Sequence, residues 1–519
     1  MALNPVERRL LYLCDHWARF VDDRSKRLLI WQVPGSAVRM IQCFFEAQKH
    51  ETPYTTGDLF ISFDVPFENS VQYSRALKEA LAGQYEASRE DLKQQGIASD
   101  WDFTPQTYPD SPSGFVQSLR FFGSKHHKQI GYLVPVFMPQ HVIDDDAFFS
   151  WLTRVLGARI PERLRFAVID SMEAPRLTSL VGSGHKLVFV DSPKINTLAT
   201  AQETFAQEGA VGPAAVFRNF LMGVVTLIEK GTADQVKAKA RDALAFARKE
   251  KWADQEVVLR ILVAGSLLKG KRFDEAVKMY LSARQSASQA ASAGHPAGAQ
   301  LVLQTWFGEA GTHFAAGDVK KAGECYDKAA VVARKIPNAI LSIEALRMAA
   351  FCYSRANLRE EAVLRGTDAF RIGEALKPEA RAMTTLPIAA VDLLRIVEPA
   401  RVTQMEEVKH RLDARIDASR RTLEQQAQSL GETATQQQFQ ALEDDLSVAI
   451  AAADLDADRA LESITSAGNQ QFRRIFVKAR EMLGKEWPLF SPAAMPRTPQ
   501  LAAATGAQQA DISGRTVTA

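Results

Sequence analysis

Residues 259–286 read LRILVAGSLLKGKRFDEAVKMYLSARQS, and two later stretches of the chain repeat their pattern. Residues 305–332 read TWFGEAGTHFAAGDVKKAGECYDKAAVV, and residues 345–372 read ALRMAAFCYSRANLREEAVLRGTDAFRI. Aligned, they share alanine at three fixed offsets: Ala264, Ala276 and Ala283; Ala310, Ala322 and Ala329; Ala350, Ala362 and Ala369. Antiparallel helices approach closely only where side chains are small, so this pattern predicts three tightly packed helical hairpins.

A polar turn separates the first two alanines of each unit. The turns read Lys269-Gly270-Lys271-Arg272, Ala316-Gly317-Asp318 and Arg355-Ala356-Asn357. Gly or Asn at this place permits the left-handed backbone conformation that ends one helix before the next begins. Four residues after the second alanine, Tyr280 and Tyr326 are predicted to fill the space between neighbouring hairpins, and the third unit has Gly366 instead.

These residues resemble the tetratricopeptide repeat family over about residues 225–396, one third of the chain. Three units match well, and a weaker one at residues 231–247 matches only the second helix. The resemblance implies a right-handed superhelix whose concave surface binds peptides or helices of partner proteins. It therefore implies recognition as the mechanism, and not catalysis.

The spacing of the units departs from the standard repeat. From Ala276 to Ala322 is 46 residues and from Ala322 to Ala362 is 40, whereas the standard period is about 34. The helices are therefore expected to be longer, or residues 286–298, rich in Ala, Ser and Gly, form a loop. Extended units of this kind resemble those of bacterial regulators and signal-transduction ATPases.

Residues 402–484 contain few Gly or Pro residues, and their apolar positions recur at spacings of three and four. This pattern predicts a long helical hairpin that reverses at residues 430–433. The hairpin is either a cap for the repeats or an arm for oligomerisation or partner binding. Residues 491–519 have no apolar period and are predicted to form a flexible tail. The apolar positions of residues 402–484 form one stripe on each predicted helix of the hairpin. The first stripe is Met405, Val408, Leu412, Ile416 and Leu423, and the second is Phe439, Leu442, Leu446, Ile450, Leu461 and Ile464.

The first 200 residues alternate short apolar runs with helical stretches, which predicts an α/β domain with a largely parallel sheet. The expected strands are residues 28–33, 58–65, 131–137, 165–169 and 187–190, and the expected helices are residues 37–48, 71–94 and 147–156.

A nucleotide-binding loop would follow the first strand of such a domain. Pro34-Gly35-Ser36-Ala37 occupies that place but has no Lys to meet the β and γ phosphates. The third strand ends in Met138-Pro139, where an Asp would hold magnesium. The layout resembles the ATPase modules of bacterial signal-transduction proteins with the nucleotide machinery lost, which implies a scaffold without a nucleotide.

Other candidate chemistry is sparse. Asp170 and Asp191 each follow a strand, so they either line a ligand site at the carboxyl edge of the sheet or cap a turn. Gly182-Ser183-Gly184-His185-Lys186 precedes a strand and favours a tight turn over a phosphate site. His126 and His127, as neighbours on one strand, would point to opposite faces, and the carboxylates of residues 144–146 would cap a helix, so neither set favours metal binding. We therefore expect no catalytic site, no cofactor and no metal.

Composition limits the partners. Lys plus Arg is 63 and Asp plus Glu is 61, so a net charge of +2 gives no field that attracts nucleic acid or an anionic membrane. The chain begins without the features of a secretory signal, and its four cysteines lack metal or disulfide spacing. We expect a cytoplasmic protein with reduced, mostly buried thiols.

We expect an α/β domain over residues 1–200, an all-α solenoid of tetratricopeptide type over 201–400, a helical hairpin over 401–487 and a tail over 488–519. The leading hypothesis is a non-catalytic adaptor or chaperone that grips a client protein, with the C-terminal helices able to join a second copy. The alternatives are a nucleotide- or inducer-responsive regulator, and an enzyme that uses Asp170 and Asp191. On the first helices of the hairpins, the residues expected to face solvent and to bind a partner are Gln304, Glu309, His313, Arg347 and Arg355.

Overall fold

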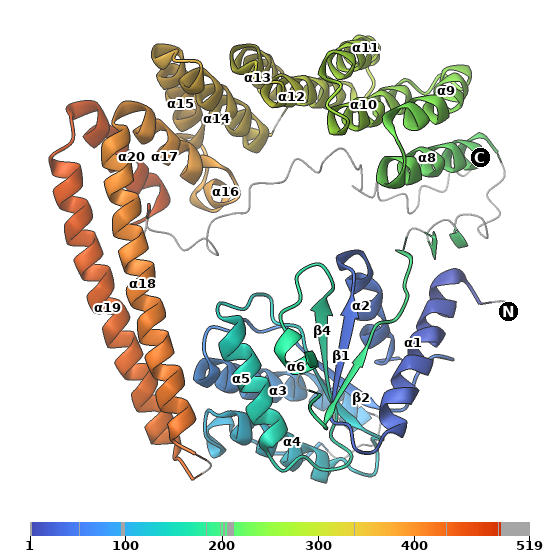
Figure 1. The fold of residues 1–519 in the computed structure, drawn as a ribbon, viewed down its shortest axis with the longest axis vertical. Helices are drawn as coiled ribbons and strands as arrows, with labels where there is room; N and C mark the ends of the chain where they lie inside the picture. The colour runs from blue at the N-terminus through green and yellow to red at the C-terminus, as the bar shows by residue number, and fades with distance from the viewer. Residues whose placement is uncertain are drawn as a thin grey trace. The chain divides into compact units, whose positions relative to one another are not determined.

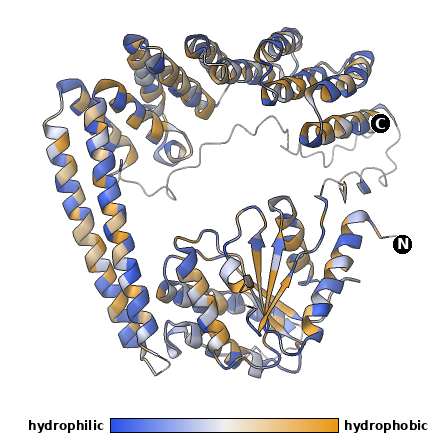
Figure 2. Ribbon diagram, viewed as in Figure 1, coloured by the Kyte–Doolittle hydropathy of each residue, from blue (hydrophilic) through white to orange (hydrophobic). Residues whose placement is uncertain are grey.

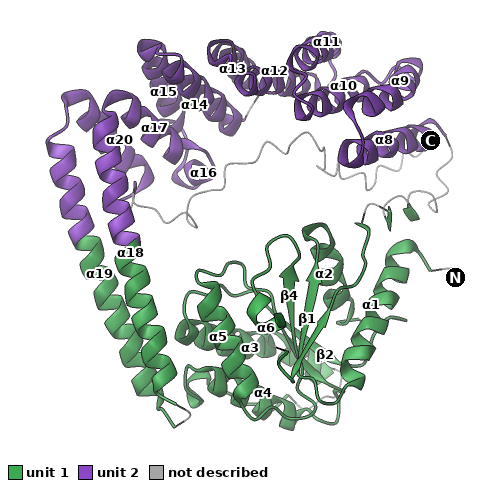
Figure 3. Ribbon diagram, in the orientation of Figure 1, with its two compact units in different colours: residues 1–209, 414–455 green, residues 210–413, 456–519 purple. Residues whose placement is uncertain are grey.

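The computed structural model divides the chain into two compact units, drawn in different colours in Figure 3. One comprises residues 1–209 and 414–455, and the other comprises residues 210–413 and 456–519. No helix within the described residues is long and apolar enough to cross a membrane. The structure describes residues 3–50, 52–94, 99–182, 184–197, 199–200, 203–204, 212–336, 338–431, 433–485 and 487–488.

The first unit is built on a parallel sheet of five strands in the order β2-β3-β4-β1-β5. Figure 1 shows this sheet with β1, β2 and β4 labelled. Each strand pairs in parallel with its neighbours, which confirms the predicted parallel α/β architecture. The sequence predicted all five strands to within two residues at either end, because buried parallel strands are continuous apolar runs. The strands are β1 Leu28–Val33, β2 Leu59–Phe63, β3 Leu133–Phe137, β4 Phe166–Ser171 and β5 Val188–Asp191.

Helices cover both faces of the sheet. Side chains alternate along a strand, so Leu28 and Ile30 of β1 enter one core while Leu29 and Trp31 enter the other. The first core is packed against α3, α4 and α5, and the second against α1 and α2. Figure 2 shows the strands as mostly hydrophobic. The helices are α1 Pro5–Asp22, α2 Val38–Ala47, α3 Ser70–Gln94, α4 Pro112–Lys125, α5 Asp145–Gly157 and the short α6 Thr178–Gly182.

The second unit contains the predicted hairpins, each with its alanines buried at the contact between its helices. Ala240, Ala243 and Ala247 of the weaker unit are also fully buried, and there the first helix is α8. The helices are α8 Pro213–Lys230, α9 Ala233–Lys249, α10 Ala253–Lys269, α11 Phe273–Ser292, α12 Gly298–Ala315, α13 Val319–Ala333, α14 Ala339–Arg355, α15 Arg359–Glu374, α16 Pro378–Ala382 and α17 Leu386–Val397.

Aromatic side chains fill the gaps between hairpins, and glycines make room for them. Tyr280 and Tyr326 are buried as predicted. A Cβ on Gly308 would overlap the ring of Tyr280, and a Cβ on Gly366 would lie 2.8 Å from Leu393 Cδ1. Gly366 therefore replaces the tyrosine of the third unit because a leucine from α17 fills that space.

The left-handed residue of each hairpin turn lies five positions before the second alanine. Gly317 has φ of 87° and Asn357 has φ of 59°, as the sequence predicted. In the first unit the prediction was wrong, because Gly270 has φ of −80° and Lys271 takes the left-handed conformation with φ of 58°. The left-handed conformation therefore follows the position five residues before the second alanine, whether or not that residue is glycine.

The extra length of the first repeat is helical. Helix α11 continues to Ser292, so only residues 293–297 separate it from α12. The loop considered for residues 286–298 is thus short, and the alternative of longer helices is confirmed. Ala287 and Ala290 continue the buried face of α11, which stabilises the added turns.

The C-terminal region forms two long helices and a shorter one: α18 Pro399–Ser429, α19 Gln436–Ser466 and α20 Gln470–Leu483. The predicted reversal lies between α18 and α19, with Glu432 outside the described residues. The predicted tail, residues 491–519, also lies outside them. Helices α18 and α19 contribute residues to both units, as the change of colour along each helix in Figure 3 shows.

The sequence predicts a separate hairpin over residues 401–487, but residues 414–455 belong to the same compact unit as the α/β domain. The physical reason is an apolar contact at the tip, where Leu423, Ala427 and Phe439 are buried with Val71 of α3. Val448 and Leu455 of α19 are exposed. Oligomerisation through these helices stays a prediction.

A buried carboxyl group accompanies this contact and gives it a pH dependence. Glu424 of α18 accepts a 2.5 Å hydrogen bond from the Ser70 amide and lies 3.5 Å from Arg154 Nη2. Burial raises the pKa of Glu424 above 4.5. From pH 4.5 upward to the raised pKa, the folded chain binds more protons at this site than the unfolded chain, so stability falls as pH rises.

Glu424→Gln keeps an acceptor oxygen for Ser70 and removes the titration. We expect the unfolding midpoint of this variant in urea to fall less between pH 4.5 and 7 than that of the unsubstituted chain. Glu90→Gln, at an exposed position of α3, is the control and should leave the profile unchanged. Parallel profiles for the Glu424→Gln and unsubstituted chains would contradict this assignment.

Candidate partner-binding surface and sheet edges

The first helices of the hairpins carry a set of ion pairs. In α10, Arg260 donates to Glu256 over 2.6 Å, and in α14, Arg347 lies 2.7 Å from Glu344. In α12, Glu309 is bound instead by Arg284 of the preceding helix, over 2.5 Å. Each pair is largely shielded from solvent, so it fixes the side chains of this surface in one arrangement.

The five predicted partner-binding residues differ in their exposure. Gln304 and Arg355 are exposed, whereas His313 and Arg347 are partly buried. The expectation of a solvent-facing Glu309 was wrong, because its side chain is only 9% exposed and is held by Arg284. Arg284, a cation from the preceding hairpin, closes that position. Partner binding by these residues stays a prediction.

The loop after β1 occupies the place of a phosphate cradle. The Gly35 amide donates to both carboxylate oxygens of Glu173, at 3.1 and 3.3 Å, and Ser171 Oγ donates to Glu173 as well. Bonds from the backbone and from Ser171 hold the pKa of Glu173 below its ordinary value. A carboxylate of the chain itself thus binds the amide that would face a phosphate.

The two candidate carboxylates at this edge have partners within the chain. Asp170 accepts bonds from the amides of Arg176 and Leu177, which follow it in the loop. Asp191 accepts from Trp31 Nε1 at 3.0 Å and lies 2.6 Å from His16 Nδ1. The contacts of Asp170 are the turn role that the sequence offered as the alternative to a ligand site, whereas Asp191 is bound by side chains of β1 and α1.

The remaining sequence candidates lie apart from one another. His126 is buried against the rings of Phe122 and Tyr85, while His127 is exposed. Asp144 caps α5 by accepting from the Ala147 amide, as predicted. Within Gly182-Ser183-Gly184-His185-Lys186, Ser183 lies outside the described residues, and the segment precedes β5 without opening a helix.

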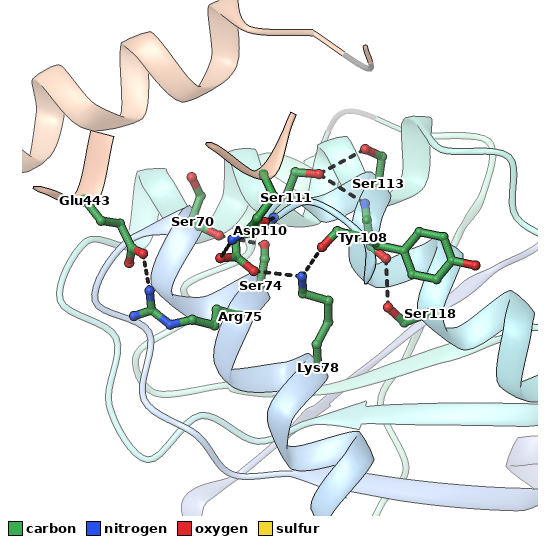
Figure 4. Close-up of polar contacts among 12 residues, drawn as sticks. Ser70, Ser74, Arg75, Lys78, Tyr108, Asp110, Ser111, Ser113, Ser118 and Glu443 are labelled. Atoms are coloured by element: carbon green, nitrogen blue, oxygen red, sulfur yellow. Dashed lines mark hydrogen bonds and ion pairs between the residues drawn. The ribbon is translucent and has the colours of Figure 1, made fainter. Parts of the chain in front are cut away.

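Sequence reasoning missed a buried polar cluster where the hairpin tip meets α3 and α4 (Figure 4). Lys78 Nζ lies 2.7 Å from Asp110 and also donates to the Tyr108 carbonyl, and both charged side chains are almost fully buried. Asp110 is bound in turn by Gln436 of α19. Arg75 and Glu443 form a second ion pair beside it. No sequence motif or fixed residue spacing predicts such a cluster.

A pocket of about 680 Å³ opens at the opposite, amino edge of the sheet. It lies between α4, the start of β3 and the segment before β4. Its floor is apolar, with Leu119, Leu133 and Leu164, and its rim carries Arg120 and Arg163. The volume of the pocket falls in the range of small-molecule sites. One of its two rim cations, Arg163, already donates a hydrogen bond to the His127 carbonyl of the chain itself.

Comparison with known proteins finds distant structural matches, among them two Rap proteins and a signal-transduction ATPase. No family model and no curated protein matches the chain. A Rap protein complexed with Competence and Sporulation Factor aligns with 12% identity, 80% coverage of this chain, 97% of that chain and a TM-score of 0.28. The apo form of RapI aligns with 10% identity, covers 87% of this chain and 98% of that chain, and has a TM-score of 0.25.

The third match is a signal-transduction ATPase with a tetratricopeptide-repeat sensor from Pyrococcus horikoshii. It aligns with 9% identity, covers 90% of this chain and 95% of that chain, and has a TM-score of 0.23. At these scores, the fold class rests on the strand order and helix packing of this chain itself.

Proposed function

We propose that this protein is a non-catalytic adaptor that binds a protein partner through its helical repeats. The observation that carries this proposal is the stack from α8 to α15, in which each helix packs against the next one along the chain. A stack of this kind presents an extended surface whose side chains are fixed in advance. Delivery of a client to a secretion or assembly machine in the cytoplasm is one setting for such a protein.

The partner-binding surface in this proposal lies on the first helices. Few positions of α10, α12 and α14 are exposed, and Gln304 on α12 and Arg355 at the end of α14 are among them. Ion pairs fix the neighbouring side chains, so a partner would meet a rigid polar surface. Complementary charge on the partner would set specificity and association rate.

A second candidate function is a nucleotide-responsive regulator, favoured by the parallel sheet with a loop and a helix directly after β1. Against it stands the carboxylate of Glu173 on the Gly35 amide. Titration of the intact chain with Mg²⁺ and ATP separates the two. Saturable binding that Glu173→Gln strengthens would favour the regulator.

Affinity capture from the native cytoplasm tests the adaptor proposal, with bound proteins identified by mass spectrometry. We expect the intact chain to retain a specific protein, and Gln304→Lys with Arg355→Glu to lose most of it. Lys328→Glu, an exposed position on the second helix α13, is the matched control and should retain it. Equal capture by both variants would move binding away from the first helices.

A further inference from the structure

Three metal-binding side chains meet inside one repeat. Glu309, His313 and Cys325 each place a ligand atom so that all three atoms lie within 4.8 Å of one another. Glu309 and Cys325 are buried and His313 is partly exposed. Within the described part of the chain, this is the one group of three or more such residues placed to share an ion.

Two helices of the same hairpin supply the group. Glu309 and His313 are four residues apart on α12, so they project from one face, and Cys325 projects from α13 opposite them. His313 Nε2 lies 3.9 Å from Glu309 Oε1. Ligands of a tetrahedral zinc ion are about 3.5 Å apart, so separations of up to 4.8 Å need to shorten by about 1.3 Å at most.

We propose that Glu309, His313 and Cys325 bind one Zn²⁺ ion between α12 and α13. A set of one carboxylate oxygen, one imidazole nitrogen and one thiolate sulfur suits Zn²⁺, whereas Mg²⁺ and Ca²⁺ prefer oxygen ligands alone. On binding, the Cys325 thiol gives its proton to solvent and its sulfur bonds to the metal.

Arg284 supports the site from the preceding helix. It donates to Glu309 Oε2 over 2.5 Å and stacks over the Trp306 ring, with Cζ 3.4 Å from the centroid. The other oxygen, Oε1, is the one nearest His313. A bonded partner that orients a ligating carboxylate is a common feature of metal sites. The carboxylate and thiolate together balance the two charges of Zn²⁺, and Arg284 leaves the site with one positive charge.

Three ligands leave the fourth position of a tetrahedral ion open. The side chain of His313 is 17% exposed, which places the solvent-facing side of the group next to it. Water or a carboxylate, imidazole or thiolate of a bound partner can take that position. The ion would join the two helices of one hairpin and, through Arg284, tie them to α11.

The test uses the full chain without an affinity tag, carrying Cys43→Ser to remove the exposed thiol. We expect this chain to bind one equivalent of Zn²⁺, measured by competition with a chromophoric chelator. Co²⁺ in its place should give the near-ultraviolet absorption of a thiolate bound to cobalt. Cys325→Ser should abolish that absorption and weaken Zn²⁺ binding about a hundredfold or more.

Two further variants test the site even if Cys325→Ser does not fold. His313→Gln, at a partly exposed position, should weaken Zn²⁺ binding about tenfold to a hundredfold. Cys352→Ser, at a buried cysteine of the next hairpin, should change neither affinity nor absorption. Absence of stoichiometric binding, or binding unchanged by His313→Gln and by Cys325→Ser, would overturn the proposal.

Discussion

Asp110→Ala is expected to destabilise the α/β unit by about 3–5 kcal/mol, the effect of leaving a buried charge without its partner. The side chain of Lys78 is 0% exposed, and Asp110 is the carboxylate within 2.7 Å of its ammonium group. The loss also removes the acceptor for Gln436 of the hairpin tip. Urea unfolding followed by tryptophan fluorescence measures the change, because Trp17, Trp31, Trp101 and Trp151 all lie in this unit.

Two variants show whether the buried charge is the cause. Lys78→Met combined with Asp110→Leu removes both charges and should recover most of the lost stability. Asp100→Ala breaks the exposed pair with Lys125 in the same unit and should have no measurable effect. A loss for Asp110→Ala no greater than that for Asp100→Ala would show that the buried pair does not stabilise this fold.

Gly308→Ala is expected to destabilise the repeats by about 1–3 kcal/mol, because the new methyl group would overlap the buried ring of Tyr280. Gly311 lies one turn along the same helix with open space around it, so Gly311→Ala should stabilise by about 1 kcal/mol through helix propensity. Urea unfolding followed by circular dichroism compares the two. Equal effects of the two substitutions would mean that Tyr280 does not pack against Gly308.

Much of the fold was predictable because local sequence patterns decide it. The β strands were visible as apolar runs, and the alanine spacing identified the hairpins. Helices α1 and α4 were missed although their capping signals were present, with Asn4, Pro5 and Glu7 in a capping box and Ser111 with Pro112 before α4. Weighing caps as well as apolar periodicity would have found both.

The candidate sites were harder to predict, because they depend on contacts between segments far apart in sequence. The burial of Glu309 follows from Arg284, which lies 25 residues away on another helix. The contact of Asp110 with Gln436 joins residues 326 apart. Neither pairing has a periodic pattern, so only the packed structure shows that Glu309 faces inward and that the hairpin tip meets the α/β domain.

We expect the repeats to bind a protein partner and the loop after β1 to bind no nucleotide. Amide hydrogen exchange of the intact chain tests both parts in one measurement, with the captured partner added in one sample and Mg²⁺ with ATP in another. We predict slowed exchange in α10, α12 and α14 with the partner, and no change with ATP. Slowed exchange at Gly35 and in α2 with ATP, with unchanged repeats in the presence of the partner, would contradict it.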